Sequence, residues 1–140
     1  MAVNDTIYKV TGRLWMENAG RILRPAGHGE IVGRRRIDRT DVDTRLIGAQ
    51  LETWRRTLHG MGAEVDEAAG RYVEHVVAHR IFEAEYHGSA TMGAFPERVT
   101  FAGVSGTRGV AFGGARERSR AAFGRPAAAV GSWLSESVYR

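Results

Sequence analysis

The 140-residue sequence contains no cysteine. Disulfides and thiol nucleophiles are therefore excluded, together with any zinc or iron–sulfur site built from thiolates, and noncovalent packing must hold the fold. The chain also has no run of about 18 apolar residues, and its first residues lack the basic and apolar regions of a secretory signal peptide. These absences predict a soluble protein that is made and used inside a cell, with no membrane partner.

Lysine is almost absent as well, because 19 of the 20 basic residues are arginine and Lys9 is the exception. A GC-rich genome would produce this bias, since its codons favour Arg, Ala, Gly and Val. Guanidinium groups placed for bidentate pairing with carboxylates or phosphates would also produce it. Both explanations remain open.

The charges that are present occur in three blocks. Residues 1–40 carry eight basic and four acidic residues, residues 41–97 carry five and ten, and residues 98–140 carry seven and two. If these blocks occupy different surfaces, the acidic middle of one copy can contact a basic flank of the next, in a head-to-tail arrangement. The charge pattern therefore predicts a self-assembling protein.

The length and the 43% hydrophobic content predict one domain with arms. We expect a basic N-terminal arm or strand region over residues 1–40, an α+β core over 41–125, and a C-terminal helix or arm over 126–140. The 18 glycines crowd residues 20–33 and 103–114, which indicates loops or hairpins there.

Alternating polarity over residues 6–16 predicts a half-buried strand. Turn residues follow, and residues 21–23 could return as a second strand, although a helix over 13–23 is a competing interpretation. We expect residues 25–33 to form a loop or an extended arm.

Two helices are predicted in the middle of the chain. The first spans Asp41 to His59, with Thr40 or Asp41 as its cap, and the second runs from about Ala63 to Tyr86. Because the connection is short, the two helices should form a hairpin or meet at a sharp bend. Four aromatic residues at amphipathic spacing indicate core or interface positions: Trp15, Trp54, Phe82 and Tyr86.

The C-terminal third begins with a loop over residues 88–96. Residues 99–104 and 109–112 flank a glycine-containing turn and predict a β-hairpin. Pro126 suits the first position of a last helix that continues to Val138. The expected fold is α+β, a helical pair packed with a small antiparallel sheet or hairpin, with extended terminal arms.

One constellation suggests metal binding. His75, His79, Glu83 and His87 repeat every four residues along the second helix, so His75 and His79 could grip one ion with Glu83 as a third ligand. The arrangement lacks the glutamate of an HExxH motif, and His87 drifts away from the first pair. The alternatives are a small metal-dependent enzyme or toxin domain and a polar helix face that makes subunit contacts.

Two arginine clusters could bind nucleic-acid phosphates, whose neutralisation releases counterions. No helix-turn-helix, zinc finger or aromatic ribonucleoprotein motif accompanies them, and the net charge is only +4. Loop charges, or arginines that pair with the acidic segment of another copy, are the other interpretation. The clusters are Arg34, Arg35, Arg36 and Arg39, and Arg116, Arg118, Arg120 and Arg125.

No residue pattern predicts catalysis. The glycine-rich stretch over 103–114 has no Walker ending, and no serine has a GxSxG setting. We therefore expect a protein that is not an enzyme, without a cofactor or a small-molecule substrate.

The order of a basic arm, a long helical pair, a glycine-tipped hairpin and a short C-terminal helix resembles the small head-to-tail connector and tail-completion (neck) proteins of long-tailed bacteriophages, particularly those of actinobacterial hosts. The resemblance covers residues 41–140 in outline, and its nearest residues are Gly93-Ala94-Phe95-Pro96 before the hairpin and Gly109-Val110-Ala111-Phe112-Gly113 within it. The arginine-rich stretch before Asp41 and the histidine ridge depart from that family.

The resemblance implies a structural subunit of a phage virion, made in the host cytoplasm. Such subunits form a ring with copies of themselves and with adjacent neck or tail proteins, around a path through which DNA passes transiently. We expect the first arginine cluster to pair with acidic residues of a neighbouring copy, namely Glu64, Asp66, Glu67 and Glu74. Trp15 and Trp133 would anchor the terminal arms on neighbours.

Overall fold

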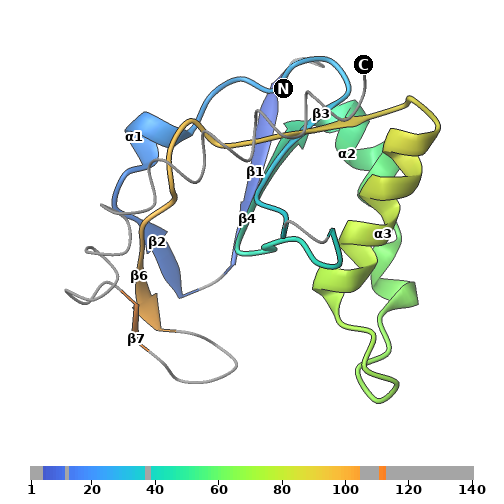
Figure 1. Ribbon diagram of the computed structural model, residues 1–140. Helices are drawn as coiled ribbons and strands as arrows, with labels where there is room; N and C mark the ends of the chain where they lie inside the picture. The colour runs from blue at the N-terminus through green and yellow to red at the C-terminus, as the bar shows by residue number, and fades with distance from the viewer. Residues whose placement is uncertain (1–4, 12, 37–38, 105–110, 113–140) are drawn as a thin grey trace. The chain divides into compact units, whose positions relative to one another are not determined.

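A computed structural model describes residues 5–11, 13–36, 39–104 and 111–112 (Figure 1). The chain divides into two compact units, one of residues 1–10 and 24–94 and the other of residues 11–23 and 95–140. Both helices and strands are present, so the predicted α+β class is confirmed.

The first unit contains a four-stranded sheet in the order β1-β4-β3-β5. β4 pairs antiparallel with β1 and β3, whereas β3 pairs parallel with β5, so the sheet is mixed and not purely antiparallel as predicted. The strands are β1 (Thr6–Val10), β3 (Glu30–Val32), β4 (Leu46–Gln50) and β5 (Thr91–Gly93).

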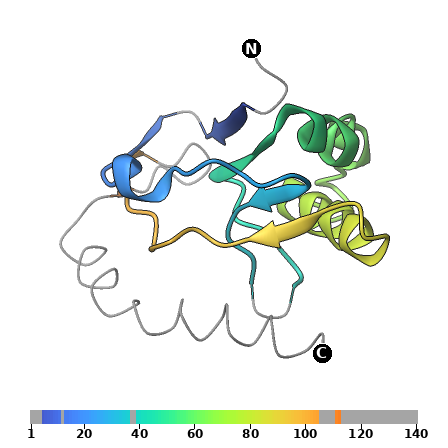
Figure 2. The ribbon, with the colours of Figure 1, turned by 90° about the horizontal axis from the view of Figure 1, so that it is seen from above.

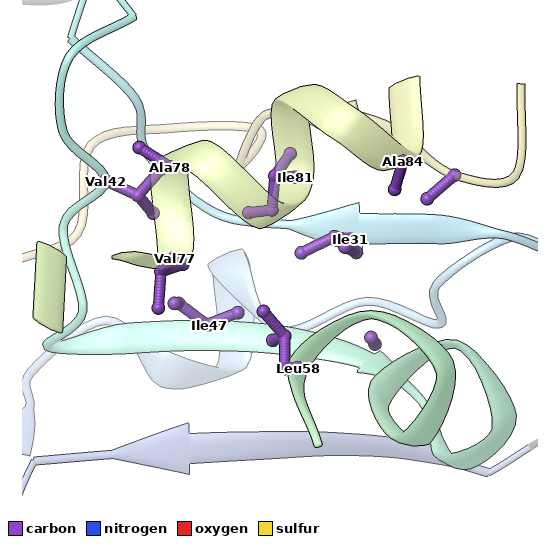
Figure 3. Packing of buried hydrophobic residues seen from close by; sticks show 10 residues of the cluster. Ile31, Val42, Ile47, Leu58, Val77, Ala78, Ile81 and Ala84 are labelled. Atoms are coloured by element: carbon purple, nitrogen blue, oxygen red, sulfur yellow. The ribbon is translucent and has the colours of Figure 1, made fainter. Parts of the chain in front are cut away.

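Two α-helices and a short 3-10 helix complete this unit. Figure 2 shows α2 and α3 beside each other on one side of β3 and β5. The core lies between these helices and the sheet, and in Figure 3 Val77 and Ile81 of α3 are directed toward Ile47 of β4 and Ile31 of β3. The helices are α2 (Leu51–Leu58), η1 (Met61–Glu64) and α3 (Val73–Tyr86).

The first predicted helix is wrong over residues 41–50, because β4 occupies their second half. Leu46, Ile47 and Ala49 are buried, as expected for an interior strand covered on both faces, and such a strand reads as a continuous apolar run. Ile47 and Leu51 are four residues apart, as on one face of a helix, but Ile47 lies in β4 and Leu51 is the first residue of α2. A side chain at Gly48 would collide with the ring of Tyr8 on β1, which explains the glycine.

The second predicted helix begins ten residues later than expected, at Val73. Before it lie η1 and a tight turn in which Asp66 and Arg71 form an isolated β-bridge. Gly70 has a φ of 75°, which glycine adopts more readily than other residues and which breaks a helix.

Several short elements differ from the loops and strands that were predicted. β3 forms within residues 25–33 and β5 within residues 88–96, and neither is long enough to show an alternating pattern. The strand predicted over 6–16 is divided between two sheets, as β1 and as β2 (Leu14–Met16). Residues 19–22 form a one-turn helix, α1 (Ala19–Ile22), and not a return strand.

The second unit contains a sheet in the order β2-β6-β7. Its antiparallel β6 (Phe101–Val104) and β7 (Ala111–Phe112) confirm the predicted hairpin. Asn18 ties α1 to the segment before β6, since its Nδ2 donates to the Arg98 carbonyl at 2.9 Å and its Oδ1 accepts from the Thr100 amide at 2.9 Å. The predicted last helix, together with Trp133, Arg116, Arg118, Arg120 and Arg125, lies outside the described residues.

Candidate assembly surface

Helix α3 has one face in the core and one face in solvent. Val76, Val77, Ala78, Ile81 and Ala84 are buried in the first unit. Burial of these apolar side chains fixes the rotation of the helix, and therefore determines which residues it presents to solvent.

The solvent face carries a stripe of ring-bearing side chains, which we call the α3 stripe. Its three aromatic members are 48% exposed at Tyr72, 48% at Phe82 and 80% at Tyr86. Two exposed histidines lie between them, so the members follow each other at steps of three, four, three and four residues, the spacing of a coiled-coil seam. The members are Tyr72, His75, His79, Phe82 and Tyr86.

The N-terminal end of α3 positions the first two members. The Tyr72 amide donates to Nδ1 of His75 at 3.4 Å, and the two ring centroids lie 5.7 Å apart. A side chain three residues into a helix that accepts from the cap amide satisfies one of the donors left open at the helix start. His75 therefore has a structural function at this cap.

The same contact bears on the metal hypothesis. When Nδ1 of a neutral imidazole accepts a hydrogen bond, the ring proton lies on Nε2, and Nε2 then has no lone pair for a metal ion. His79 Nδ1 lies 3.7 Å from Glu83 Oε2, and the His87 amide donates to the Glu83 carbonyl at the end of the helix. Within the described residues, no three His, Asp or Glu side chains gather as a metal-binding group.

The arginines of the first cluster have partners in their own chain. Arg35 donates to Glu85 at 2.6 Å, with both side chains largely buried, and Arg36 donates to Asp41 at 3.0 Å. Burial alone would raise the pKa of Asp43, but hydrogen bonds and charge from Arg45, with a smaller contribution from the Arg34 charge, lower it overall. A contact between this cluster and a second copy would have to compete with these interactions.

Most of the acidic residues expected at the same interface also have hydrogen-bond partners within the chain. Glu64 accepts from Arg80 at 2.6 Å and from Arg71 at 3.0 Å, and the Arg80 hydrogen bond is the main cause of the lowered pKa of Glu64. Glu74 accepts from the Thr44 hydroxyl at 2.9 Å, and Asp66 accepts from the Ala69 amide at 3.0 Å. Of these four acidic residues, only Glu67 has a carboxylate without a hydrogen-bond or ion-pair partner among the described residues.

Another ion pair ties the loop before β3 to that strand. Arg24 donates to both Glu30 oxygens, at 2.8 and 2.6 Å, and these bonds lower the pKa of Glu30. Lys9 donates to the Thr44 carbonyl at 2.6 Å, and burial lowers the pKa of this one lysine. Several opposite charges of the first unit are therefore paired within the chain.

Trp15 is 61% exposed on β2 of the second unit. It is therefore available for a contact, and its anchoring of an arm on a neighbour stays a prediction. No described helix is both long and apolar enough to span a membrane.

Comparisons of the chain with protein-family models, with curated proteins and with solved structures give no significant match.

The α3 stripe was only partly recognised from the sequence. Phe82 and Tyr86 were predicted as core or interface residues, and the histidines were considered as metal ligands. Tyr72 was not among the residues predicted at an interface. The sequence did contain a signal for the whole stripe: its five ring-bearing residues follow each other at alternating steps of three and four residues.

Proposed function

We propose that this protein is a non-enzymatic structural subunit that assembles with a second copy of itself through the α3 stripe. The setting is the one implied by the resemblance to phage neck proteins, a virion in which adjacent neck or tail proteins are further partners. The observation that carries the proposal is the continuous, solvent-exposed stripe of rings on α3. Single exposed apolar residues are ordinary, whereas a contiguous set marks an interaction surface.

The spacing of the stripe favours another helix as the occupant. A seam that repeats every 3.5 residues stays on one side of a helix and fits into a similar seam on a partner. Aromatic residues are also enriched in the cores of protein interfaces. The α3 helix of a second copy presents such a seam, so the stripe can be covered without a different protein.

The polar groups along the stripe favour an antiparallel pair. His75, whose Nδ1 accepts from the Tyr72 amide, presents an Nε2–H donor in the N-terminal half of the stripe, whereas the Glu83 carboxylate lies toward its C-terminal end. In an antiparallel pair centred on His79, Glu83 of each copy lies level with His75 of the other, and opposite helix dipoles also align favourably. A parallel pair would separate this donor from the carboxylate and would align the helix dipoles unfavourably.

This contact is isologous, so by itself it produces a dimer. The ring implied by the resemblance needs a second, heterologous contact. The arginine cluster around Arg35 and its acidic counterparts have partners within the chain, so the proposal places the first assembly contact on α3.

Sedimentation of the full-length protein over a range of concentrations tests the proposal. We expect the average mass to rise from 15.4 kDa toward twice that value, with a dissociation constant of roughly micromolar or weaker, because one helix pair buries a small area. Trp15→Ser, which removes the exposed ring of the other unit, should leave this rise unchanged.

A constant mass of one chain at every concentration would contradict the proposal. If Trp15→Ser abolished the mass increase, the contact would lie on the second unit and not on α3. A single chain that binds duplex DNA with an affinity that falls steeply with added salt would favour the nucleic-acid alternative.

A further inference from the structure

A hollow of about 330 Å³ lies in the first unit, and none of its lining residues belongs to the α3 stripe. Its lining residues come from three segments: the end of α2, the turn before β3, and the turn that joins α3 to β5. Its lining includes His28, Gly29, Arg56, Gly88, Ser89 and Thr91.

The lining combines polar and apolar surface in similar amounts and contains no acidic residue. Arg56 and His28 contribute the groups that can carry positive charge, and no Asp or Glu lies among the lining residues. Arg56 also forms no salt bridge within the described residues. Several other arginines of the unit, such as Arg24, Arg35 and Arg80, do have carboxylate partners.

The Arg56 side chain is held in place although it is exposed. Its Nη2 donates to the Ser89 carbonyl at 2.8 Å, which directs the guanidinium toward the turn after α3. The remaining guanidinium N–H groups have no acceptor among the described residues. A planar group with several oriented donors matches the oxygens of a tetrahedral oxyanion.

Backbone geometry keeps the hollow open. Gly29 and Gly88 have φ angles of 72° and 66°, which side-chain-bearing residues rarely adopt, and neither places a side chain in the space between the turns. The Thr91 amide donates to the Gly29 carbonyl at 2.9 Å, so the two turns are joined beside the hollow. An anion could therefore approach Arg56 without displacing a side chain at these two positions.

We infer that this hollow binds a phosphate group, with Arg56 as the main ligand and His28 and Thr91 beside it. The group could be free phosphate or part of a phosphodiester. The site is independent of the α3 contact, so either can fail without the other.

The test is a titration of the ¹⁵N-labelled full-length protein, observed by the amide chemical shifts of Gly29, Gly88, Ser89 and Thr91. Inorganic phosphate and dimethyl phosphate serve as probes, at an ionic strength held constant with sodium chloride. We expect saturable shifts at these amides. Arg56→Gln should weaken the binding roughly tenfold or more, because it removes charge-assisted hydrogen bonds.

Arg55→Gln is the matched control, since Arg55 is exposed on the same helix and does not line the hollow. It should bind phosphate like the wild type. Stronger binding of inorganic phosphate than of dimethyl phosphate would indicate a free phosphate or a monoester, and the reverse a phosphodiester. Shifts that do not saturate with either probe, or equal binding by Arg55→Gln and Arg56→Gln, would overturn the inference.

Discussion

Replacing Phe82 with glutamate should raise the dissociation constant of the dimer about 30-fold or more, which corresponds to about 2 kcal/mol. Phe82 is half exposed and lies within the α3 stripe, so its ring would be buried against the partner helix. Glutamate removes that apolar contact and places two new carboxylates, one from each copy, in a small interface. Sedimentation equilibrium of the variant and the wild type measures the change.

Arg55→Glu is the control for the added negative charge, because Arg55 is exposed on α2 and forms no salt bridge among the described residues. Its dissociation constant should stay within about threefold of the wild-type value, since exposed charges away from the contact contribute little. Equal weakening by both substitutions would show a general charge effect and would remove Phe82 from the interface.

Replacing Ile81 with alanine should lower the free energy of unfolding of the protomer by about 2–5 kcal/mol. Ile81 is adjacent to Phe82 but has no exposed surface, and it packs between α3 and the sheet in the core cluster (Figure 3). The loss combines the transfer of the missing apolar atoms with the cavity that they leave. Urea unfolding at a concentration where the wild type is monomeric measures it.

Ile81→Val is the graded control and should cost about 0.5–1.5 kcal/mol, because it removes one methylene group. Phe82→Ala, at the exposed neighbour, should cost less than Ile81→Ala in the same experiment. A larger loss at Phe82 than at Ile81 would mean that α3 is rotated differently, and the stripe would then belong to the core.

The C-terminal hairpin and the α2–α3 pair were predictable because local signals agree with tertiary structure there. Glycines between two short apolar runs indicated β6 and β7, and the apolar repeat from Val73 onward indicated α3. The boundary between β4 and α2 was not predictable in this way. A strand buried on both faces and a buried helix segment share the same apolar composition, and only pairing with β1 and β3 distinguishes them.

The charge blocks along the sequence do not remain separate everywhere in the described part of the fold. Arg35 and Glu85 are 50 residues apart in the sequence and belong to different charge blocks, yet they form an ion pair in one chain. Blocks along a sequence become separate surfaces only if the fold keeps their segments apart. Here β3, β4 and α3 bring basic and acidic segments together.

The histidine ridge was predictable as a helix face, but its function was not. A repeat of four residues places His75 and His79 together on any helix, and a metal site, a cap and an interface share that pattern. The hydrogen bond between the Tyr72 amide and His75 distinguishes a cap from a ligand, and it depends on where the helix starts. That start was ten residues from its predicted position.

Disulfide trapping at His79 tests the antiparallel α3 pair most directly, because the chain has no cysteine of its own. In a pair centred on this residue, the two copies of His79→Cys face each other, and mild oxidation of the native protein should link most chains into a covalent dimer. Arg55→Cys, exposed on α2, should remain largely unlinked under the same conditions. Equal, slow cross-linking of both variants, in proportion to collision, would contradict the proposed contact.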